Sequence, residues 1–446
     1  MILDKYQEKI IKEKNNLLIL ASAGSGKTFT LIHKVKHLLK AYSSEEILIV
    51  SFTNETVNNL KGKLNEDIHI FTFHKLAIYL LNKYNYNYKL VGDNILIYSI
   101  NEYFINYIND IEKKLLCKHF FELNYKSLIK SNKFKYYKKN IHTFIKLYKT
   151  NNYSYDYILT LLKSKKDSLF ILIVINIMTL YNNELRSTNS LDLDDLITEA
   201  SKVVKNLNLK YKYIFVDEFQ DTSQIRFDLI YNIFINTNSI INIFGDDFQS
   251  IYAFSGCKLS IMLNINKYIP NIKTLTLNKN YRLSNDLITI SNSFITKNDK
   301  QIKKDIYSEI YNNNTINIIY YSNKEKALNK ALKEGLRVSK DIMILSRYKH
   351  DLKGINNYKT LTVHEAKGLE ADIVIILNMN NGYYGFPSNI KNHIFIDKIE
   401  KESESFLYAE ERRLFFVAMT RARKKLYILV PRDNPSPFIK EIKKML

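Results

Sequence analysis

The chain contains 446 residues, enough for roughly two to four domains with substantial hydrophobic cores. Lysine and arginine number 66 against 45 aspartates and glutamates, and this net charge of +21 favours a polyanionic partner such as nucleic acid, although a compositional bias toward Lys, Asn, Ile and Tyr accounts for part of it. Two cysteines exclude a disulfide framework, a zinc site or an iron–sulfur cluster, so we expect a reducing, cytoplasmic setting. We expect no membrane partner, because the most apolar stretch, residues 169–180, is too short to cross a bilayer and fits a buried helix.

Residues 16–31 combine a short apolar strand, a turn of small residues and the start of an amphipathic helix. Backbone N–H groups in such a turn converge on phosphate oxygens, and the positive end of the helix and Lys27 attract the same anion. Thr28 can hold Mg²⁺. We therefore predict a phosphate-binding loop, although Ala21 stands where the strict pattern has glycine, and a turn that binds nothing is the alternative.

Two further apolar strands are predicted at 46–50 and 68–70, and each ends in aromatic and polar residues. Rings can stack on bases while amide and imidazole groups hold phosphates, a combination that suits single-stranded nucleic acid. Phenylalanine at a strand end is also common in a core, and that interpretation stays open. The residues concerned are Phe52, Asn54, Phe73 and His74.

Beyond residue 84 the sequence changes to Tyr, Lys and Asn at helical spacing, which predicts a helical insertion that ends near residue 186. A series of lysines interleaved with tyrosines can follow a phosphate backbone, and a solvated basic face explains them equally well. These lysines are Lys130, Lys133, Lys135, Lys138, Lys139, Lys146 and Lys149.

An apolar strand at 213–216 delivers Asp217 and Glu218 at its carboxyl end, where a parallel sheet places its chemistry. In a phosphate-loop ATPase one such acid holds Mg²⁺ and the next polarises the attacking water. The pair, together with the glycine-rich loop, therefore predicts ATP hydrolysis.

The following strand, 240–244, leads to three candidate residues in one short segment. Gln249 is placed to sense the γ-phosphate, whereas Tyr252 and Phe254 are placed to face a base. Hydrolysis and nucleic-acid binding are thus expected to be coupled through this segment.

The second half alternates strands and helices again, which predicts a second α/β domain. Its arginines at the ends of elements, Arg282, Arg347 and Arg421, are candidates for a cation that reaches from this domain onto a transferring phosphoryl group. The strands are predicted at 274–277, 341–345, 360–363, 372–377 and 426–430.

Taken together and in order, these stretches resemble the motifs of superfamily 1A DNA helicases, the UvrD, Rep and PcrA group. The stretches that resemble motifs Q, I, Ia, Ib, II, III, IV, V and VI are 3–7, 21–28, 52–54, 72–74, 216–221, 245–252, 280–282, 363–370 and 411–422. So many ordered motifs make chance similarity improbable.

The resemblance implies ATP and Mg²⁺ as ligands and assigns a role to each matching residue. Gln7 and Tyr281 would bind the adenine, Glu370 the ribose, and Asp217 with Thr28 the metal. Glu218 would activate water, and the γ-phosphate would be surrounded by Gln249, Arg282 and Arg421. The loop residues around the phosphates would be Ala23, Gly24, Ser25, Gly26 and Lys27, and the DNA track would include Phe52, Asn54, Phe73, His74, Tyr252, Phe254, Arg347 and His364.

The resemblance also implies an α/β fold with two RecA-like parallel-sheet domains and a helical insertion in the first. The expected ranges are 1–84 and 187–262 for domain 1A, 85–186 for the insertion 1B and 263–446 for domain 2A. The large 2B domain of relatives would be absent or minimal, because barely a loop separates Arg347 from Thr360.

Three functions are open at this point. The first is an ATP-dependent helicase or translocase that moves 3′ to 5′ on single-stranded DNA. The second is an ATPase that senses DNA ends and regulates a partner nuclease, as in the Gabija anti-phage systems that small helicases of this kind resemble. The third is a DNA-binding clamp that does not hydrolyse ATP.

Overall fold

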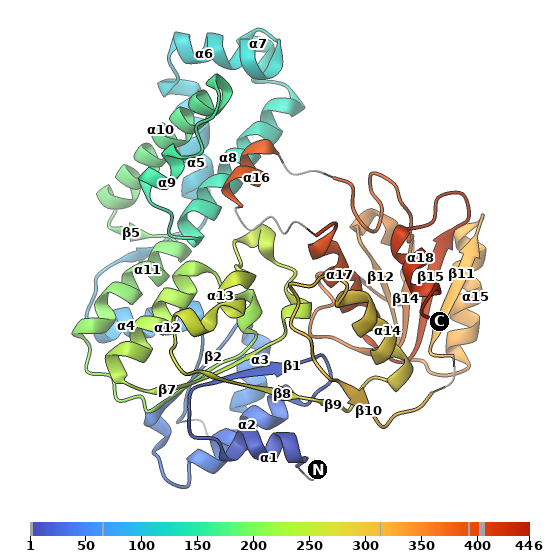
Figure 1. Ribbon diagram of the computed structural model, residues 1–446. Coiled ribbons are helices and arrows are strands. Elements are labelled where there is room, and N and C mark those ends of the chain that lie inside the picture. The colour runs from blue at the N-terminus through green and yellow to red at the C-terminus, as the bar shows by residue number, and fades with distance from the viewer. Residues whose placement is uncertain (1–2, 65–66, 313, 391–392, 401–405) are drawn as a thin grey trace.

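The computed structural model describes residues 3–64, 67–312, 314–390, 393–400 and 406–446. Two parallel sheets form the centres of two lobes, and a helical body rises from the first lobe (Figure 1). This architecture confirms the predicted α/β class, with two parallel-sheet units and a helical insertion in the first.

The first sheet has six parallel strands, and its apolar strands alternate side chains between two buried faces, as expected when helices cover both sides. In sheet order the strands are β3 (His69–Thr72), β2 (Ile47–Ser51), β6 (Tyr213–Val216), β7 (Ile240–Gly245), β1 (Leu17–Ala21) and β8 (Lys273–Leu277). One face is covered by α1 (Lys5–Lys12), α2 (Lys27–Leu38) and α3 (Asn54–Lys61). The other is covered by α4 (Phe73–Lys83), α11 (Leu193–Val203), α12 (Gln224–Thr237) and α13 (Leu259–Leu263).

Strand β8 corrects the expected division of the chain. Residues 274–277 were assigned to the second domain, but Lys273 to Leu277 pair in parallel with Leu17 to Ala21 of β1. The predicted start of the second domain at residue 263 is therefore too early, and the first lobe continues through β8. The alternating polarity of this short edge segment predicts a strand, but it does not indicate which sheet the strand joins.

The insertion is a bundle of helices on a two-stranded base of β4 (Lys89–Leu90) and β5 (Ser190–Leu191). Its helices are α5 (Asn94–Glu102), α6 (Asp110–Leu116), α7 (Tyr125–Leu128), α8 (Asn132–Thr150), α9 (Tyr155–Leu159) and α10 (Lys165–Ser187). Among the described helices, α10 alone has the length and apolar character needed to cross a membrane. Phe170, Val174 and Ile177 of α10 are fully buried in the core of the insertion, and this packing accounts for its apolar sequence.

Two of the insertion lysines join it to the first lobe instead of facing solvent. Lys149 Nζ lies 2.6 Å from Asp192 Oδ2 and 2.8 Å from Asp195 Oδ2, and Lys146 Nζ lies 3.0 Å from Asp194 Oδ2. These two side chains are therefore occupied by the acidic start of α11. The proposed phosphate-tracking role does not hold for them, because their ammonium groups are already paired. Local spacing in the sequence could not reveal these partners, which lie more than 40 residues away.

The second sheet has five parallel strands, in the order β11 (Ile316–Tyr321), β15 (Ala422–Pro431), β14 (Ala371–Ile376), β12 (Ile342–Ser346) and β13 (Lys359–Thr362). Strand β11 was not predicted. One face is covered by α14 (Asn285–Ile295), α17 (Ala409–Met419) and α18 (Pro437–Lys443), and the other by α15 (Lys324–Leu336). Between β12 and β13 the chain forms only a short 3₁₀ turn, Lys349–Leu352, so no domain is inserted there.

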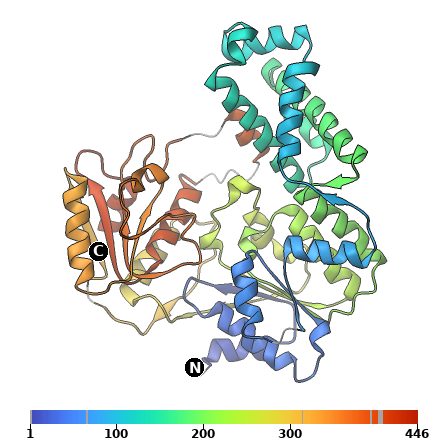
Figure 2. The ribbon, with the colours of Figure 1, turned by 180° about the vertical axis from the view of Figure 1, so that it is seen from behind.

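The lobes are connected by β9 (Lys279–Asn280), which pairs with β10 (Tyr307–Ser308), and by a helix that leaves the second lobe. This helix, α16 (Ile394–Ile399), lies against the insertion in both views (Figures 1 and 2). Phe395 stacks on Phe170 with ring centroids 3.7 Å apart, and Lys398 pairs with Asp167. The second lobe thus contributes a helix to the core of the insertion.

Candidate functional site

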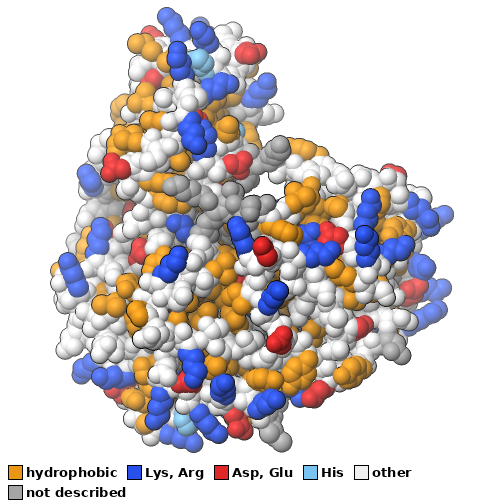
Figure 3. All heavy atoms as spheres, viewed as in Figure 1, with side chains coloured by type: hydrophobic (Ala, Val, Ile, Leu, Met, Phe, Trp, Pro, Cys, Tyr) orange, Lys and Arg blue, Asp and Glu red, His pale blue; other side chains and the backbone are white. Residues whose placement is uncertain are grey.

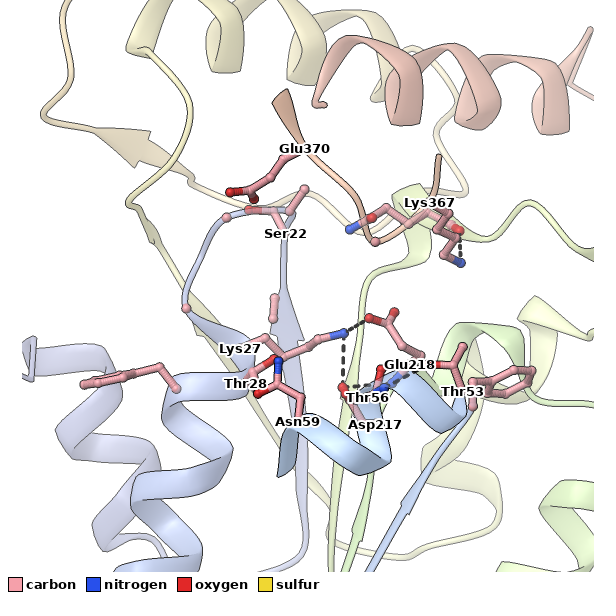
Figure 4. A pocket seen from close by; sticks show the side chains of 18 of the residues that line it. Ser22, Lys27, Thr28, Thr53, Thr56, Asn59, Asp217, Glu218, Lys367 and Glu370 are labelled. Carbon is pink, nitrogen blue, oxygen red and sulfur yellow. Dashed lines mark hydrogen bonds and ion pairs between the residues drawn. The ribbon is translucent and has the colours of Figure 1, made fainter. Parts of the chain in front are cut away.

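A cavity of about 760 Å³ lies between the two lobes, at the carboxyl edge of the first sheet and beside the residues that precede β14 and β15 of the second. Residues of the phosphate loop and the acid pair line it from the first lobe, and Figure 4 shows Glu370 and Lys367 facing them from the second. The predicted residues that line this cavity are Gln7, Ala23, Gly24, Gly26, Lys27, Thr28, Phe52, Asp217, Glu218, Gln249, Tyr252, Tyr281, Arg282, Glu370 and Arg421. The topology therefore brings the predicted nucleotide residues of both halves together.

The phosphate loop has the backbone that its glycines permit. Gly24 and Gly26 have φ values of +85° and +79°, in the left-handed region that disfavours side chains. The hydroxyls of Ser22 and Ser25 are buried and lack a partner among the described residues. Gly26 caps α2 without a side-chain bond, so the helix directs its first N–H groups into the loop. These groups fit the oxygens of a polyphosphate.

The connection between the lobes holds this loop in place. Asn280 Nδ2 donates to the carbonyl oxygen of Ala23 at 2.6 Å, and the backbone N–H of Tyr281 donates to the carbonyl oxygen of Gly24 at 2.9 Å. The loop is thus fixed by the residues that lead into the second lobe. Sequence reasoning did not identify Asn280 in this role, although it lies in the stretch that resembles motif IV.

Lys27 and the acid pair form a buried charge cluster, drawn with dashed lines in Figure 4. Lys27 Nζ lies 3.0 Å from Asp217 Oδ1 and also bonds to Glu218. Burial by itself would raise the pKa of Glu218, but Lys27 and Lys367 outweigh it and lower that pKa to about 2. Glu218 is therefore ionised, and its φ of +53° is a strained backbone conformation of the kind that clusters at functional sites.

Thr28 and Asp217 line the cavity beside the phosphate loop, where both oxygens suit Mg²⁺. Among the described residues no group of three or more His, Cys, Asp or Glu side chains gathers as a metal site. The donor set therefore fits an ion that takes most of its ligands from phosphates and water, the usual arrangement for Mg²⁺ with a nucleotide.

The arginine in the turn between α17 and β15 reaches the cavity from the second lobe. Arg421 is 1% exposed, and its Nη2 donates to Gln249 Oε1 at 3.2 Å. Its Nε donates to the carbonyl oxygen of Val417 at 2.9 Å, which fixes the guanidinium. Burial, assisted by Arg282, lowers the pKa of Arg421 to about 10, so it remains charged. A buried cation beside a phosphate site can stabilise charge on a transferring phosphoryl group.

Arg282 and Glu370 differ from their expected separate roles, because the two side chains pair with each other. Glu370 also lies 3.1 Å from Arg423 Nη1. Opposite charges on one cavity wall attract, so a ligand must compete with this pair. Both residues nevertheless line the cavity.

Gln7 and Tyr281 both line the cavity beside Gly26. Gln7 Oε1 accepts a hydrogen bond from the backbone N–H of Asp4 at 3.1 Å in the capping box of α1. The expected use of both amide groups for an adenine edge is therefore incomplete, because the oxygen is occupied. Tyr281 is 37% exposed and donates its hydroxyl to Asp4 Oδ2 at 2.5 Å, which leaves a ring face for stacking.

An aromatic group beside this cavity, formed by Tyr252 and Phe254 of the first lobe and His364 of the second, joins the two lobes. The rings of Phe254 and His364 lie 5.6 Å apart, and the Tyr252 hydroxyl donates to the carbonyl oxygen of His364 at 3.1 Å. Phe254 is 54% exposed, as a base-stacking ring must be. Burial, followed by Arg347, lowers the pKa of His364 to about 4, and Arg347 is itself held by Glu411 at 2.8 Å.

The first-lobe part of the predicted track requires one correction. Phe73 is only 3% exposed and belongs to the core of the lobe, so it cannot stack on a base. Its ring supports the half-buried Phe52, with centroids 5.7 Å apart, and Arg226 lies 4.7 Å from the centre of the Phe52 ring. Asn54 is exposed at the start of α3, and burial lowers the pKa of the half-buried His74.

A profile of the UvrD/REP helicase N-terminal domain matches residues 3–270, and a profile of the UvrD-like helicase C-terminal domain matches residues 356–432. The chain belongs to the UvrD/REP helicase family. DNA helicase IV of Escherichia coli (strain K12) is 26% identical over 98% of this chain and 69% of its own length. ATP-dependent DNA helicase Rep of Buchnera aphidicola (subsp. Schizaphis graminum) is 28% identical over 83% and 55%, respectively. A probable DNA helicase II homolog of Mycoplasma capricolum is 30% identical over 77% and 48%.

These matches confirm the resemblance to superfamily 1A, and the helicase C-terminal match falls on the second sheet. The chain spans about half the length of the Rep and helicase II relatives. The finer resemblance to a Gabija subunit stays a hypothesis.

Sequence reasoning missed Lys367, although it lies in the stretch that resembles helicase motif V. Its Nζ lies 2.5 Å from Asp221 Oδ2 and 2.6 Å from the carbonyl oxygen of Gln249. The same ammonium lies 4.9 Å from the centre of the Tyr252 ring. This second-lobe lysine therefore contacts the loop that follows the acid pair, at Asp221, and the segment that leads to the aromatic group, at Gln249.

Proposed function

We propose that this protein is an ATP-dependent translocase that moves 3′ to 5′ on single-stranded DNA. The observation that carries the proposal is the single cavity in which Lys27 and Glu218 of one lobe face Arg421 of the other. Membership of the UvrD/REP helicase family supports the same reaction and direction.

In this proposal the phosphate loop and Lys27 bind the triphosphate, and Tyr281 stacks on the adenine. Glu218, ionised and fixed by its neighbours, takes a proton from the attacking water. Arg421 and Arg282 stabilise the charge that develops on the γ-phosphoryl oxygens, and Gln249 connects Arg421 to the first lobe. Thr28 and Asp217 would hold Mg²⁺, which would supply further charge neutralisation.

Coupling to DNA follows from the short distance along the chain between Gln249 and the exposed ring of Phe254. The Gln249 side chain contacts the second lobe at Arg421, and Tyr252 contacts it at the backbone of His364. A change in the angle between the lobes therefore alters the nucleotide contact and the aromatic group together. Repeated closing and opening of the lobes can then move the aromatic contacts from one base of the strand to the next.

The proposal is translocation and does not extend to processive unwinding of duplex DNA. The family resemblance implies a 2B domain that contacts duplex DNA in relatives, whereas here β12 and β13 are joined by residues 347–358 alone. We propose the divisions 1A, 1B and 2A as before, with the start of 2A moved to the residues after β8.

The decisive test measures ATP hydrolysis with and without single-stranded DNA, and displacement of streptavidin from either end of an oligonucleotide. We expect DNA to stimulate hydrolysis and streptavidin to be displaced from the 5′ end only. Lys27→Ala should abolish both activities. Hydrolysis at the same rate with and without DNA would contradict the proposal. The absence of hydrolysis would contradict it as well and would favour the DNA-binding clamp.

The same assay distinguishes the end-sensing alternative and its nuclease partner. A translocase should respond alike to linear and circular single strands of the same length. Stimulation by linear DNA alone would favour a sensor of DNA ends, and the search for a partner nuclease would then become the next experiment.

A further inference from the structure

Lys304 is a buried lysine that lies outside every stretch that resembles a helicase motif. Its Nζ lies 2.5 Å from Asp246 Oδ1 and 2.5 Å from Asp247 Oδ1. The ammonium also lies 3.7 Å from the centre of the Phe248 ring. The side chains of Lys304 and Asp247 are 0% exposed and that of Asp246 is 1% exposed, so water does not solvate these charges.

A chain of hydrogen bonds leads from this ion cluster to the cavity. Gln249 Nε2 donates to Asp246 Oδ2 at 2.6 Å, and Gln249 Oε1 accepts from Arg421 Nη2 at 3.2 Å. Because the amide nitrogen is fixed by Asp246, the carbonyl oxygen must point toward Arg421. The orientation of Gln249 therefore depends on the position of the Asp246 carboxylate.

A second chain leads from the same aspartate to the acid pair. The backbone N–H of Asp246 donates to Gln220 Oε1 at 2.9 Å, and Gln220 Nε2 donates to Glu218 Oε2 at 2.5 Å. Asp246 thus stands at the junction between the water-activating carboxylate and the arginine of the second lobe.

The ammonium of Lys304 offsets the negative charge of the two neighbouring buried aspartates. Without it, the two like charges would repel each other in a region of low dielectric constant. Asp246 would also lose the bond that holds its Oδ1, so it would rotate or take up a proton even where Asp247 is made neutral. Either change removes the fixed acceptor that Gln249 uses.

Lys304 lies in the stretch that returns from α14 of the second lobe to β10. In the same stretch the backbone N–H of Ile302 donates to Asp247 Oδ2 at 2.8 Å. Helix α14 packs in the second-lobe core, so this stretch ties the start of the second lobe to the segment after β7.

We propose that Lys304 is a positioning residue for ATP hydrolysis, which fixes Asp246 so that Gln249 presents its oxygen to Arg421. The inference rests on the proposed ATPase activity. Lys304 acts through Asp246 and Gln249 and does not itself line the cavity.

The test compares steady-state ATP hydrolysis and binding of a fluorescent ATP analogue in Lys304→Met and in the double variant Lys304→Met/Asp247→Asn. The second substitution removes one buried negative charge, so the double variant folds even if the single one does not. We expect kcat to fall roughly 10- to 100-fold in both, as for other residues that orient reacting groups, with analogue affinity changed less than about threefold. Lys304→Arg, which keeps the charge, should regain part of kcat.

The matched control is Lys34→Met. Lys34 is also 0% exposed in the first lobe, but its ammonium donates to the carbonyl oxygens of Ile10 and Glu13, away from the cavity. Its kcat per folded molecule, measured with folded fraction from thermal unfolding, should match that of the original protein.

A double variant with full kcat would overturn the inference, because the ammonium would then be needed only to offset charge. Lys304→Met with a loss no greater than that of Lys34→Met would overturn it as well. An inactive original protein would instead contradict the proposed function itself.

Discussion

At the scale of single residues, Glu218 is the proposed general base, and several charged and polar side chains surround it. It is the carboxylate that Lys27, Lys367 and Gln220 all contact or influence, and its backbone is strained. Glu218→Gln keeps the shape and removes the base. We expect ATP turnover to fall by about 10² to 10⁴, the usual contribution of a general base, while nucleotide binding persists in equilibrium dialysis. Turnover close to normal would exclude Glu218 as the base.

The exposed ring of Phe254 and the buried ring of Phe73 give opposite predictions. Phe254→Ala should weaken binding of single-stranded DNA by about 1 to 3 kcal/mol in fluorescence anisotropy, because a stacking partner is lost. Phe73→Ala should instead lower the free energy of unfolding by about 3 to 5 kcal/mol, because it leaves a cavity in the core. Its DNA affinity per folded molecule should change less than that of Phe254→Ala. The reverse ranking would return Phe73 to the DNA surface.

His364 predicts a dependence of stability on pH. Its pKa is lowered to about 4 in the folded protein, mainly by burial, whereas an unfolded histidine titrates near its ordinary value. Between about pH 6.5 and 4 the unfolded chain binds the proton more strongly, so stability present above this window is lost as the pH falls. Urea unfolding of His364→Gln should show about 2 kcal/mol less loss between pH 7 and 5 than the original protein. Identical losses would contradict the lowered pKa.

At the scale of elements, the junction between α8 and α11 decides how the insertion is held. Burial would raise the pKa of Asp192, but Lys149 and the hydrogen bonds from the Asp195 N–H and the Tyr181 hydroxyl together lower it to about 2. Lys149→Ala would leave this buried carboxylate and that of Asp195 without their cation, and should lower the free energy of unfolding by about 3 to 5 kcal/mol. Urea unfolding measures the change.

The control for that prediction is Lys139→Ala on the same helix. Lys139 is exposed, and its removal should change the free energy of unfolding by no more than about 0.5 kcal/mol. Equal effects at both positions would mean that the junction does not depend on the Lys149 ion pairs.

At the scale of the whole molecule, the chain carries a net charge of +21, and on the face shown in Figure 3 the lysines and arginines are not gathered in one patch. Figure 3 shows lysine and arginine over both lobes and the insertion, with aspartate and glutamate between them. We expect affinity for single-stranded DNA to fall linearly with salt on a log–log plot, with a slope of about −0.7 for each phosphate neutralised. Anisotropy titrations between low and moderate salt measure this slope. A slope near zero would leave stacking as the sole source of binding.

Much of the nucleotide site was predictable, because its residues follow strands that end at one edge of a parallel sheet. Lys27 and Thr28 follow β1, Asp217 and Glu218 follow β6, and the segment with Gln249 follows β7. Once such strands are recognised, the geometry of the sheet brings their ends together. The DNA track was less predictable, because a ring after a strand can turn outward like Phe254 or inward like Phe73.

The amino-acid sequence by itself determined the fold class, the family and the phosphate loop with its acid pair, because these depend on local strand and turn patterns in a fixed order. Only the tertiary structure decided that β8 joins the first sheet, that Arg282 pairs with Glu370, and that Lys304 lies between two buried aspartates. Each of these features is a contact between residues distant in the chain, and its energy depends on burial and on the partner's charge. Neither quantity is encoded in local spacing.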